Sequence, residues 1–235
     1  MSLNKTAYNA VWSEHQAGRG ANEISSALLK IPEKVVQDFP LLENITLWSD
    51  FCIPQFLYNG YCTEVFLKNN HYALKTIEQK FCEPGHSSIQ EVDSVHSQIE
   101  KALSVSEIYS PVSLLRVLTK VRKKSMKIIE LQPGDFLNFQ ATSQSFKFSE
   151  VPFTKVKYIR LDVQDPLQVS FKESFVNDDF NDVSIVPKTR KKDKPVVMPK
   201  VSVLTADKVK DLKAMLKYMP LADRQYYQNV FKNNK

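Results

Sequence analysis

Apolar positions recur along this chain with both helical and strand periods, which predicts a mixed α/β protein. Near the N-terminus, Ile24, Ala27 and Leu28 share one face of a helix that begins at residue 21. We expect Pro32 to end or interrupt this helix, because proline removes a backbone donor and clashes with the preceding turn. The segment from Ile45 to Trp48 then predicts a short buried strand.

Further elements follow from the same patterns. A helix is expected over residues 55–68. Strands are expected over residues 71–81, 127–131, 155–161 and 167–175. The turn at Asp165–Pro166 joins the last two strands into a hairpin.

Two helices are marked by their start signals. Ser87 with Gln90 approximates a capping box, and apolar residues follow at close to helical spacing. These residues are Ile89, Val92, Val95, Ile99 and Leu103. Ser110 followed by Pro111 predicts the start of a second helix, which we expect to run to about Lys124.

The composition changes after residue 176. An acidic stretch, NDDFND, is followed by a basic stretch with several prolines, VPKTRKKDKPVVMPK, and we expect a linker over residues 177–203. Two short helices divided by Pro220 are predicted beyond it. Their apolar stripe, expected to dock on the main body, consists of Leu204, Val209, Leu212 and Leu216. The expected division is therefore a core at 1–176, a linker at 177–203 and a helical hairpin at 204–235.

Composition and charge narrow the classes of function. Hydrophobic residues make up 43% of the 235 residues, which suits a globular core. The chain has no apolar run near eighteen residues, so we expect no membrane partner. Three cysteines without a CxxC pair favour a reducing compartment. None of the five glycines forms a phosphate-binding loop.

The net charge of +6 is compatible with a nucleic-acid partner. Candidate phosphate contacts lie at the end of the helix that begins at Pro111 and in the basic linker. They are Arg116, Lys120, Arg122, Lys123 and Lys124, and then Lys188, Arg190, Lys191 and Lys192. Alternatively, these cations have no ligand and are only the solvated end of a helix and a solvated linker. The basic run in the linker is also typical of a nuclear-import signal.

Two carboxylates stand where a metal site can form. Asp50 lies at the end of the strand at 45–48, and Asp93 lies on a later helix, three residues before His96. Carboxylates from separate elements hold the paired Mg²⁺ ions, ~4 Å apart, of nucleases. Alternatively, Asp50 is an ordinary turn aspartate, and Asp93 and His96 belong to a solvated polar face of their helix. Zinc held by Cys82, His86, Asp93 and His96 is another alternative, although this spacing is not that of a standard zinc finger.

Four stretches extend this interpretation. They are Trp12, Glu14, Arg19–Ile24 and Ser26; Asp50, Cys52 and Gln55; Gly85–Ser87, Asp93, His96 and Ile99–Glu100; and Leu212 with Tyr226–Val230. In this order they resemble the motifs of the C-terminal part of a transposon-encoded family with a DDE-type, RNase H-like core. The resemblance implies an RNase H-like mixed sheet flanked by helices. It also implies that Asp50 and Asp93 are remnant catalytic residues that bind Mg²⁺ or Mn²⁺. His96, on the same helix as Asp93, is then a second metal ligand, a general base or a phosphate contact.

The chain departs from this pattern in two ways. The family's first catalytic aspartate would precede Met1. In the second motif Phe51, Ile53–Pro54 and Phe56 replace asparagine or small residues. Loss of one member of a cooperating set removes most of an active site's rate. We therefore expect a transposase-derived nuclear protein that binds DNA or RNA and keeps only a remnant of the catalytic site.

Two other functions stay open. One is a metal-dependent nuclease or strand transferase, completed by an upstream segment or by another acidic residue such as Glu14. The other is a protein-interaction scaffold with a chromatin-associated partner, in which Phe51, Ile53 and Phe56 fill the former cleft.

Overall fold

The protein is a mixed α/β structure whose described residues fall into two compact units. The computed structural model describes residues 2–3, 6–49, 73–82, 91–144, 146–176, 179–186, 196–198 and 204–233. One unit comprises residues 1–18, 89–133 and 199–235, and the other comprises residues 19–88 and 134–198. We call them unit 1 and unit 2.

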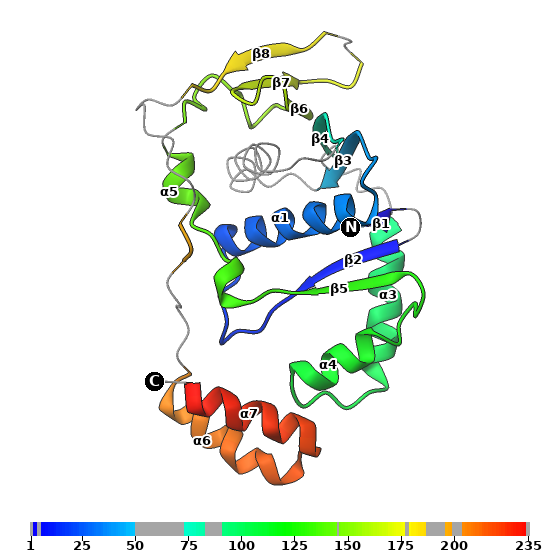
Figure 1. Cartoon of the computed structure of the whole chain (residues 1–235), viewed down its shortest axis with the longest axis vertical. Coiled ribbons are helices and arrows are strands. Elements are labelled where there is room, and N and C mark those ends of the chain that lie inside the picture. The colour runs from blue at the N-terminus through cyan, green and yellow to red at the C-terminus, as the bar shows by residue number, and fades with distance from the viewer. Residues whose placement is uncertain are drawn as a thin grey trace. The chain divides into compact units, whose positions relative to one another are not determined.

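Unit 2 contains a five-stranded mixed sheet (Figure 1). Its strands are β3 (Asn44–Ser49), β4 (Thr76–Phe81), β6 (Tyr158–Asp162), β7 (Gln168–Lys172) and β8 (Asn181–Ser184), in the order β3-β4-β6-β7-β8. β3 and β4 are parallel, and every other neighbouring pair is antiparallel. The strands predicted near 45–48, 71–81, 155–161 and 167–175 are confirmed, as is the hairpin of the last two.

The register of this sheet separates an apolar face from a polar one. Ile45, Ile77, Leu161 and Val169 pair in one row across four strands, and each is at most 4% exposed. Side chains alternate between the faces of a strand, so the residues between them point to the opposite face. That opposite face carries most of the polar residues of the strands.

Helix α1 (Ala21–Asp38) lies on one side of this sheet in unit 2 (Figure 1). The prediction that Pro32 ends or interrupts it is wrong, because the helix continues for six residues beyond the proline. An internal proline costs about 3 kcal/mol. Val35 and Val36, both fully buried, follow on the inward face. Burying two such side chains contributes about 1.5–3 kcal/mol each, which offsets that cost.

The first turns of α1 also hold the short helix α5 (Phe139–Ser143). Asn22 Oδ1 accepts a hydrogen bond of 2.9 Å from the backbone N–H of Gln140. Ser26 Oγ accepts one of 3.0 Å from the N–H of Leu137 and donates to the carbonyl of Asn22. The polar residues of this segment therefore have structural partners.

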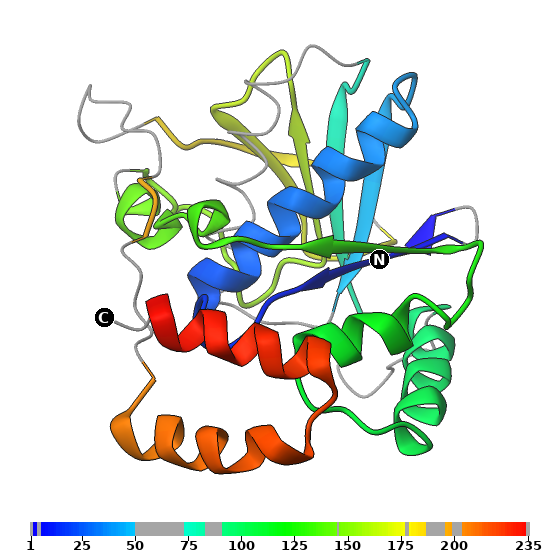
Figure 2. The ribbon, with the colours of Figure 1, turned by 60° about the horizontal axis from the view of Figure 1, so that its bottom comes forward.

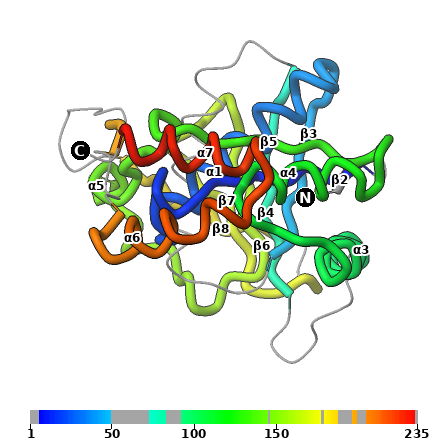
Figure 3. The backbone as a smooth tube through the Cα atoms, turned by 90° about the horizontal axis from the view of Figure 1, so that it is seen from below, coloured from blue at the N-terminus to red at the C-terminus, as the bar shows by residue number. Residues whose placement is uncertain are grey.

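Unit 1 combines a small sheet with two pairs of helices. Its strands are β1 (Ser2–Leu3), β2 (Thr6–Val11) and β5 (Met126–Glu130), and β2 and β5 are parallel. Its helices are α3 (Glu91–Ser104), α4 (Pro111–Leu118), α6 (Ala206–Met215) and α7 (Leu221–Asn233). Figure 2 shows α6 and α7 as a helical hairpin, and Figure 3 shows α7 passing beside α4.

A buried carboxylate joins α7 to α4. Asp223 of α7 is fully buried, and its Oδ1 accepts hydrogen bonds from Ser110 Oγ at 2.5 Å and from the Ser113 N–H at 3.2 Å. Ser110 is itself the N-cap of α4, as predicted, within a complete capping box. An anion at a helix N-terminus is favoured by the helix dipole. The predicted hairpin is thus attached to the rest of unit 1 through a charged cap.

Several expectations need correction. The helix expected to reach Lys124 ends at Leu118. The stretch expected to be only a linker contains β8, which pairs with β7 and so completes the sheet. The helix expected over residues 55–68 lies outside the described residues. No helix in the described part of the chain is long and apolar enough to cross a membrane.

The contribution of the Asp223 charge to stability can be tested by mutation. Burial opposes the charge of Asp223, but hydrogen bonds from Ser110 and Ser113 and the field of Arg116 outweigh it and hold its pKa below the usual value of an aspartate. We expect Asp223→Asn to lower the free energy of unfolding by about 1–3 kcal/mol at pH 7. Urea denaturation measures this loss.

The pH dependence has a defined sign. A lowered pKa stabilises the folded protein above the pKa of the unfolded chain, and this contribution is lost as the pH falls through the folded value. The difference between wild type and Asp223→Asn should therefore shrink as the pH falls below about 4. Asp211→Asn, on an exposed position of α6, is the control and should change little. A difference that stays constant with pH would contradict the role given to the charge.

Candidate nucleic-acid interface

The predicted metal and catalytic residues are only partly described. Asp93 and His96 are exposed on α3. Asp50 lies outside the described residues, as do His86 and Gln55. Within the described ranges, no group of three or more His, Cys, Asp or Glu residues is placed to hold a metal ion. The site at Asp50 and Asp93 stays a prediction.

The first and last of the four motifs meet within unit 1. Tyr226 of α7 places its hydroxyl 3.3 Å from Ser13 Oγ and 3.3 Å from His15 Nδ1. Glu14, suggested as a substitute acidic residue, is exposed and forms an ion pair of 2.7 Å with Lys208. Burial raises the pKa of Tyr226, so its hydroxyl keeps its proton at neutral pH. These contacts fasten α7 to the turn after β2.

The predicted phosphate contacts of unit 1 all lie in and after the last turn of α4. The chain from Pro111 to Lys127 carries six cations and no carboxylate. Four of the predicted contacts are exposed, namely Arg116, Lys120, Lys123 and Lys124. Lys127, at the start of β5, is exposed as well. We call residues 116–127 the basic turn.

Arg122 differs from its neighbours in this turn. Its φ of 49° is in the left-handed region, which non-glycine residues seldom adopt. The carbonyl of Arg122 accepts a hydrogen bond of 2.7 Å from the N–H of Ser125, which closes the turn before β5. Arg122 is half-buried, so the exposed phosphate contacts predicted for this turn are the other four. The linker cations Lys188, Arg190, Lys191 and Lys192 lie outside the described residues.

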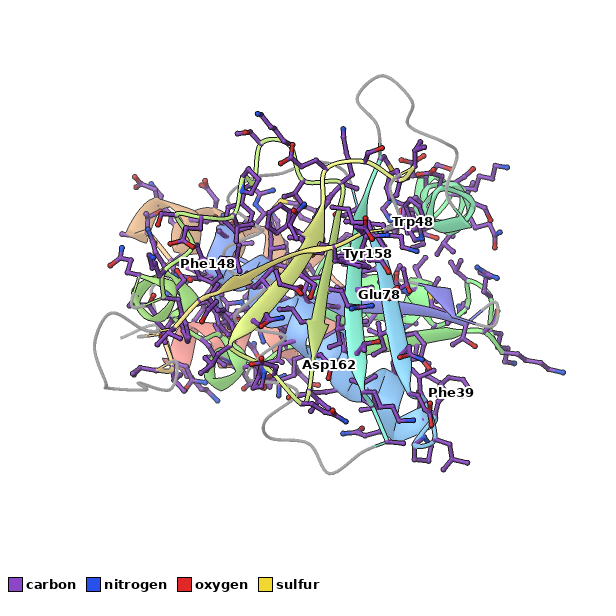
Figure 4. All side chains as sticks on the ribbon, turned by 90° about the horizontal axis from the view of Figure 1, so that it is seen from above. Phe39, Trp48, Glu78, Phe148, Tyr158 and Asp162 are labelled. Carbon is purple, nitrogen blue, oxygen red and sulfur yellow. The ribbon has the colours of Figure 1, made fainter. Side chains whose placement is uncertain are left out.

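A second group of aromatic and cationic side chains lies on the polar face of the sheet in unit 2. Trp48 of β3 pairs directly with Lys80 of β4, Lys80 with Tyr158 of β6, and Tyr158 with Lys172 of β7. Phe180, just before β8, extends this row because its ring contacts Tyr158 at a centroid distance of 5.1 Å. We call these five residues the aromatic row, and Figure 4 shows Trp48 and Tyr158 near one end of the sheet.

Cation–π contacts link the members of the aromatic row. The Lys80 ammonium lies 4.7 Å from the Tyr158 ring centroid and 5.7 Å from that of Trp48. The Lys172 ammonium lies 4.3 Å from the Phe180 centroid. Such contacts contribute about 0.5–1 kcal/mol at exposed sites. The row is thus organised before any ligand binds.

The neighbouring row of the same face is polar. Thr46, Glu78, Arg160, Ser170 and Asp182 pair across all five strands. Thr46 Oγ1 donates to Glu78 at 3.1 Å, and Ser170 Oγ donates to Asp182 at 2.5 Å. Burial, followed by a hydrogen bond to Glu78, raises the pKa of Tyr158 above its usual range. The carboxylates of this row are therefore engaged with hydroxyl groups.

The aromatic row was not predicted from the sequence. Each strand separately carries an aromatic or cationic residue at a position that alternates with buried residues. These residues are Trp48, Lys80, Tyr158 and Lys172. The pairing of the strands, which brings these positions side by side, could not be predicted from the separate segments.

Comparison of the chain with protein-family models, with curated proteins and with solved structures finds no match.

The contact between the first and last motifs can be tested by Tyr226→Phe. Loss of the hydroxyl that lies near Ser13 and His15 should lower the free energy of unfolding by about 0.5–1.5 kcal/mol. Chemical denaturation measures the change. Tyr218→Phe, which alters a tyrosine that is 63% exposed, should leave stability unchanged. Equal effects of the two variants would show that the contact contributes nothing.

Proposed function

We propose that this chain is a nucleic-acid-binding protein derived from a transposase, with an RNase H-like core and incomplete catalysis. One observation carries the proposal of nucleic-acid binding: the basic turn exposes several cations and includes no carboxylate. The derivation from a transposase rests on the resemblance of the four motifs.

The basic turn has the features of a phosphate-binding surface. Lys120, Lys123 and Lys124 lie within five residues of one another in a tight turn, so their charges act on the same region of a polyanion. Binding of cations to phosphates releases counterions and is weakened by salt. Such contacts position a nucleic acid without reading its sequence.

The plain alternative is that these cations only compensate the dipole of α4. A dipole effect is confined to the last turn of a helix. Lys123 and Lys124 lie beyond Leu118, the last residue of the helix, by more than one turn. The dipole therefore accounts for Arg116 but not for the cations that follow the helix.

The same proposal includes a nuclear location and a chromatin-associated partner. It treats Asp50, Asp93 and His96 as remnants of a catalytic site that would use Mg²⁺ or Mn²⁺. Asp93 and His96 are exposed on α3, and the basic turn offers a surface for phosphates, so we propose binding as the function.

The decisive experiment removes the charges of the basic turn. Lys120→Gln, Lys123→Gln and Lys124→Gln are combined, and binding to fluorescent DNA and RNA is measured by anisotropy between 50 and 300 mM salt. We expect wild-type binding to weaken with salt and the triple variant to bind at least tenfold more weakly at 100 mM salt. Each lost phosphate contact should reduce the slope of log K against log salt by about 0.7–0.9.

A control variant separates local contacts from net charge. Lys101, Lys210 and Lys232 are exposed lysines of the same unit and are changed to glutamine together. This control has the same net charge as the test variant and should keep most of the affinity. Equal losses in the two variants would contradict a specific role for the basic turn. Absence of salt-dependent binding by the wild type would overturn the proposed function.

A further inference from the structure

We propose that the aromatic row in unit 2 is a second binding site, and that its ligand is single-stranded nucleic acid whose bases stack on Trp48 and Tyr158. This inference goes beyond the phosphate contacts of the basic turn, which lies in the other unit and does not discriminate single strands from duplexes.

The exposure of Trp48 is the first support, whereas Lys80, Tyr158, Lys172 and Phe180 are half-buried. Trp48 is 54% exposed, and nearby Phe175, whose ring centroid lies 6.0 Å from that of Trp48, is 43% exposed. The buried face of the same strands is closed by residues such as Ile45 and Ile77. Large rings left open to solvent beside a well-filled apolar face are costly to solubility, and such patches mark binding surfaces.

The order of the side chains indicates the kind of ligand. Aromatic and cationic residues alternate along the row, as Trp48, Lys80, Tyr158, Lys172 and Phe180. Neighbouring strands lie about 4.8 Å apart, so Trp48 and Tyr158, which are two strands apart, are separated by about 10 Å. A single strand offers flat bases and phosphates in alternation, and proteins bind it with stacking rings and a positive track.

The charges of the face fit a phosphate path along the aromatic row. The row contains two lysines and no carboxylate. Glu78 and Asp182 lie in the neighbouring row, where hydroxyl groups donate to them, and Arg160 lies between them in register. Asp162 is toward the opposite end of the sheet from Trp48 (Figure 4). A polyanion following the aromatic row therefore meets the lysines first.

A duplex does not fit this chemistry, because its bases are already stacked and turned inward. Stacking on an open sheet requires bases that can be splayed out, which single strands provide. The row therefore predicts a preference for single strands over duplexes of the same length. Both single-stranded DNA and single-stranded RNA have the necessary chemistry, and the experiment compares them.

The fluorescence of Trp48 reports on binding at the row. The chain has two tryptophans, so Trp12→Phe leaves Trp48 as the sole tryptophan. In this background the full chain is titrated with oligo(dT), oligo(U) and a duplex, each of twelve nucleotides per strand, while tryptophan emission is recorded. We expect saturable quenching by at least one single strand, and duplex binding at least tenfold weaker.

Two variants test the row while keeping the fold. Lys80→Gln with Lys172→Gln retains Trp48 as the probe, and it should weaken single-strand binding at least fivefold and reduce the salt slope by about 1.4. Trp48→Leu, made at an exposed position of an edge strand, should weaken binding measured by anisotropy at least fivefold. Tyr218→Ala removes an exposed aromatic ring of unit 1 and should leave both measurements unchanged.

Several outcomes would overturn the inference. These are absence of quenching, equal binding of duplex and single strand, and equal losses in Tyr218→Ala and Trp48→Leu. Emission that changes with protein concentration, in the absence of nucleic acid, would identify the face as a contact between copies of the chain.

The Lys120, Lys123 and Lys124 triple variant keeps the row intact, so it should retain quenching even if the proposal for the basic turn fails. Loss of quenching in that variant would show that the row is not a separate site.

Discussion

The two-residue period of the strands in unit 2 is the constraint on which the proposed surfaces of that unit depend. Burial of Ile45, Ile77, Leu161 and Val169 on one face fixes the register, because a slip by one residue would expose all of them. The same register places Trp48, Lys80, Tyr158 and Lys172 side by side on the other face. Packing of the core therefore determines the order of a surface that does not take part in the core.

A comparable dependence links a buried cap and an exposed surface in unit 1. Asp223 caps α4 from α7, and α4 leads directly into the basic turn. The left-handed conformation of Arg122 then directs the chain into β5. The exposed lysines of this turn lie between two fixed elements. Their positions are therefore set by the elements on either side of the turn.

Much of the fold could be predicted from local patterns, whereas the surfaces required long-range information. The cap at Ser110, the break at Pro220 and the hairpin at Asp165–Pro166 each depend on a few neighbouring residues. Pro32 could not be interpreted in that way, because distant packing of Val35 and Val36 offsets its local cost. β8 was missed since its acidic sequence lacks strand alternation, and it is a strand because it pairs with β7. For the site, the cations of the basic turn were found from sequence, but the aromatic row depends on pairings between residues as distant as Lys80 and Tyr158.

The interleaving of the two units has a consequence for how the protein is made. The chain passes between unit 1 and unit 2 four times, and β2 of unit 1 pairs with β5, more than a hundred residues later. During synthesis, the first segment of each unit leaves the ribosome before the segments with which it packs. Contacts between segments so far apart in sequence slow folding. A fragment cut at one boundary would leave strands or helices without their partners.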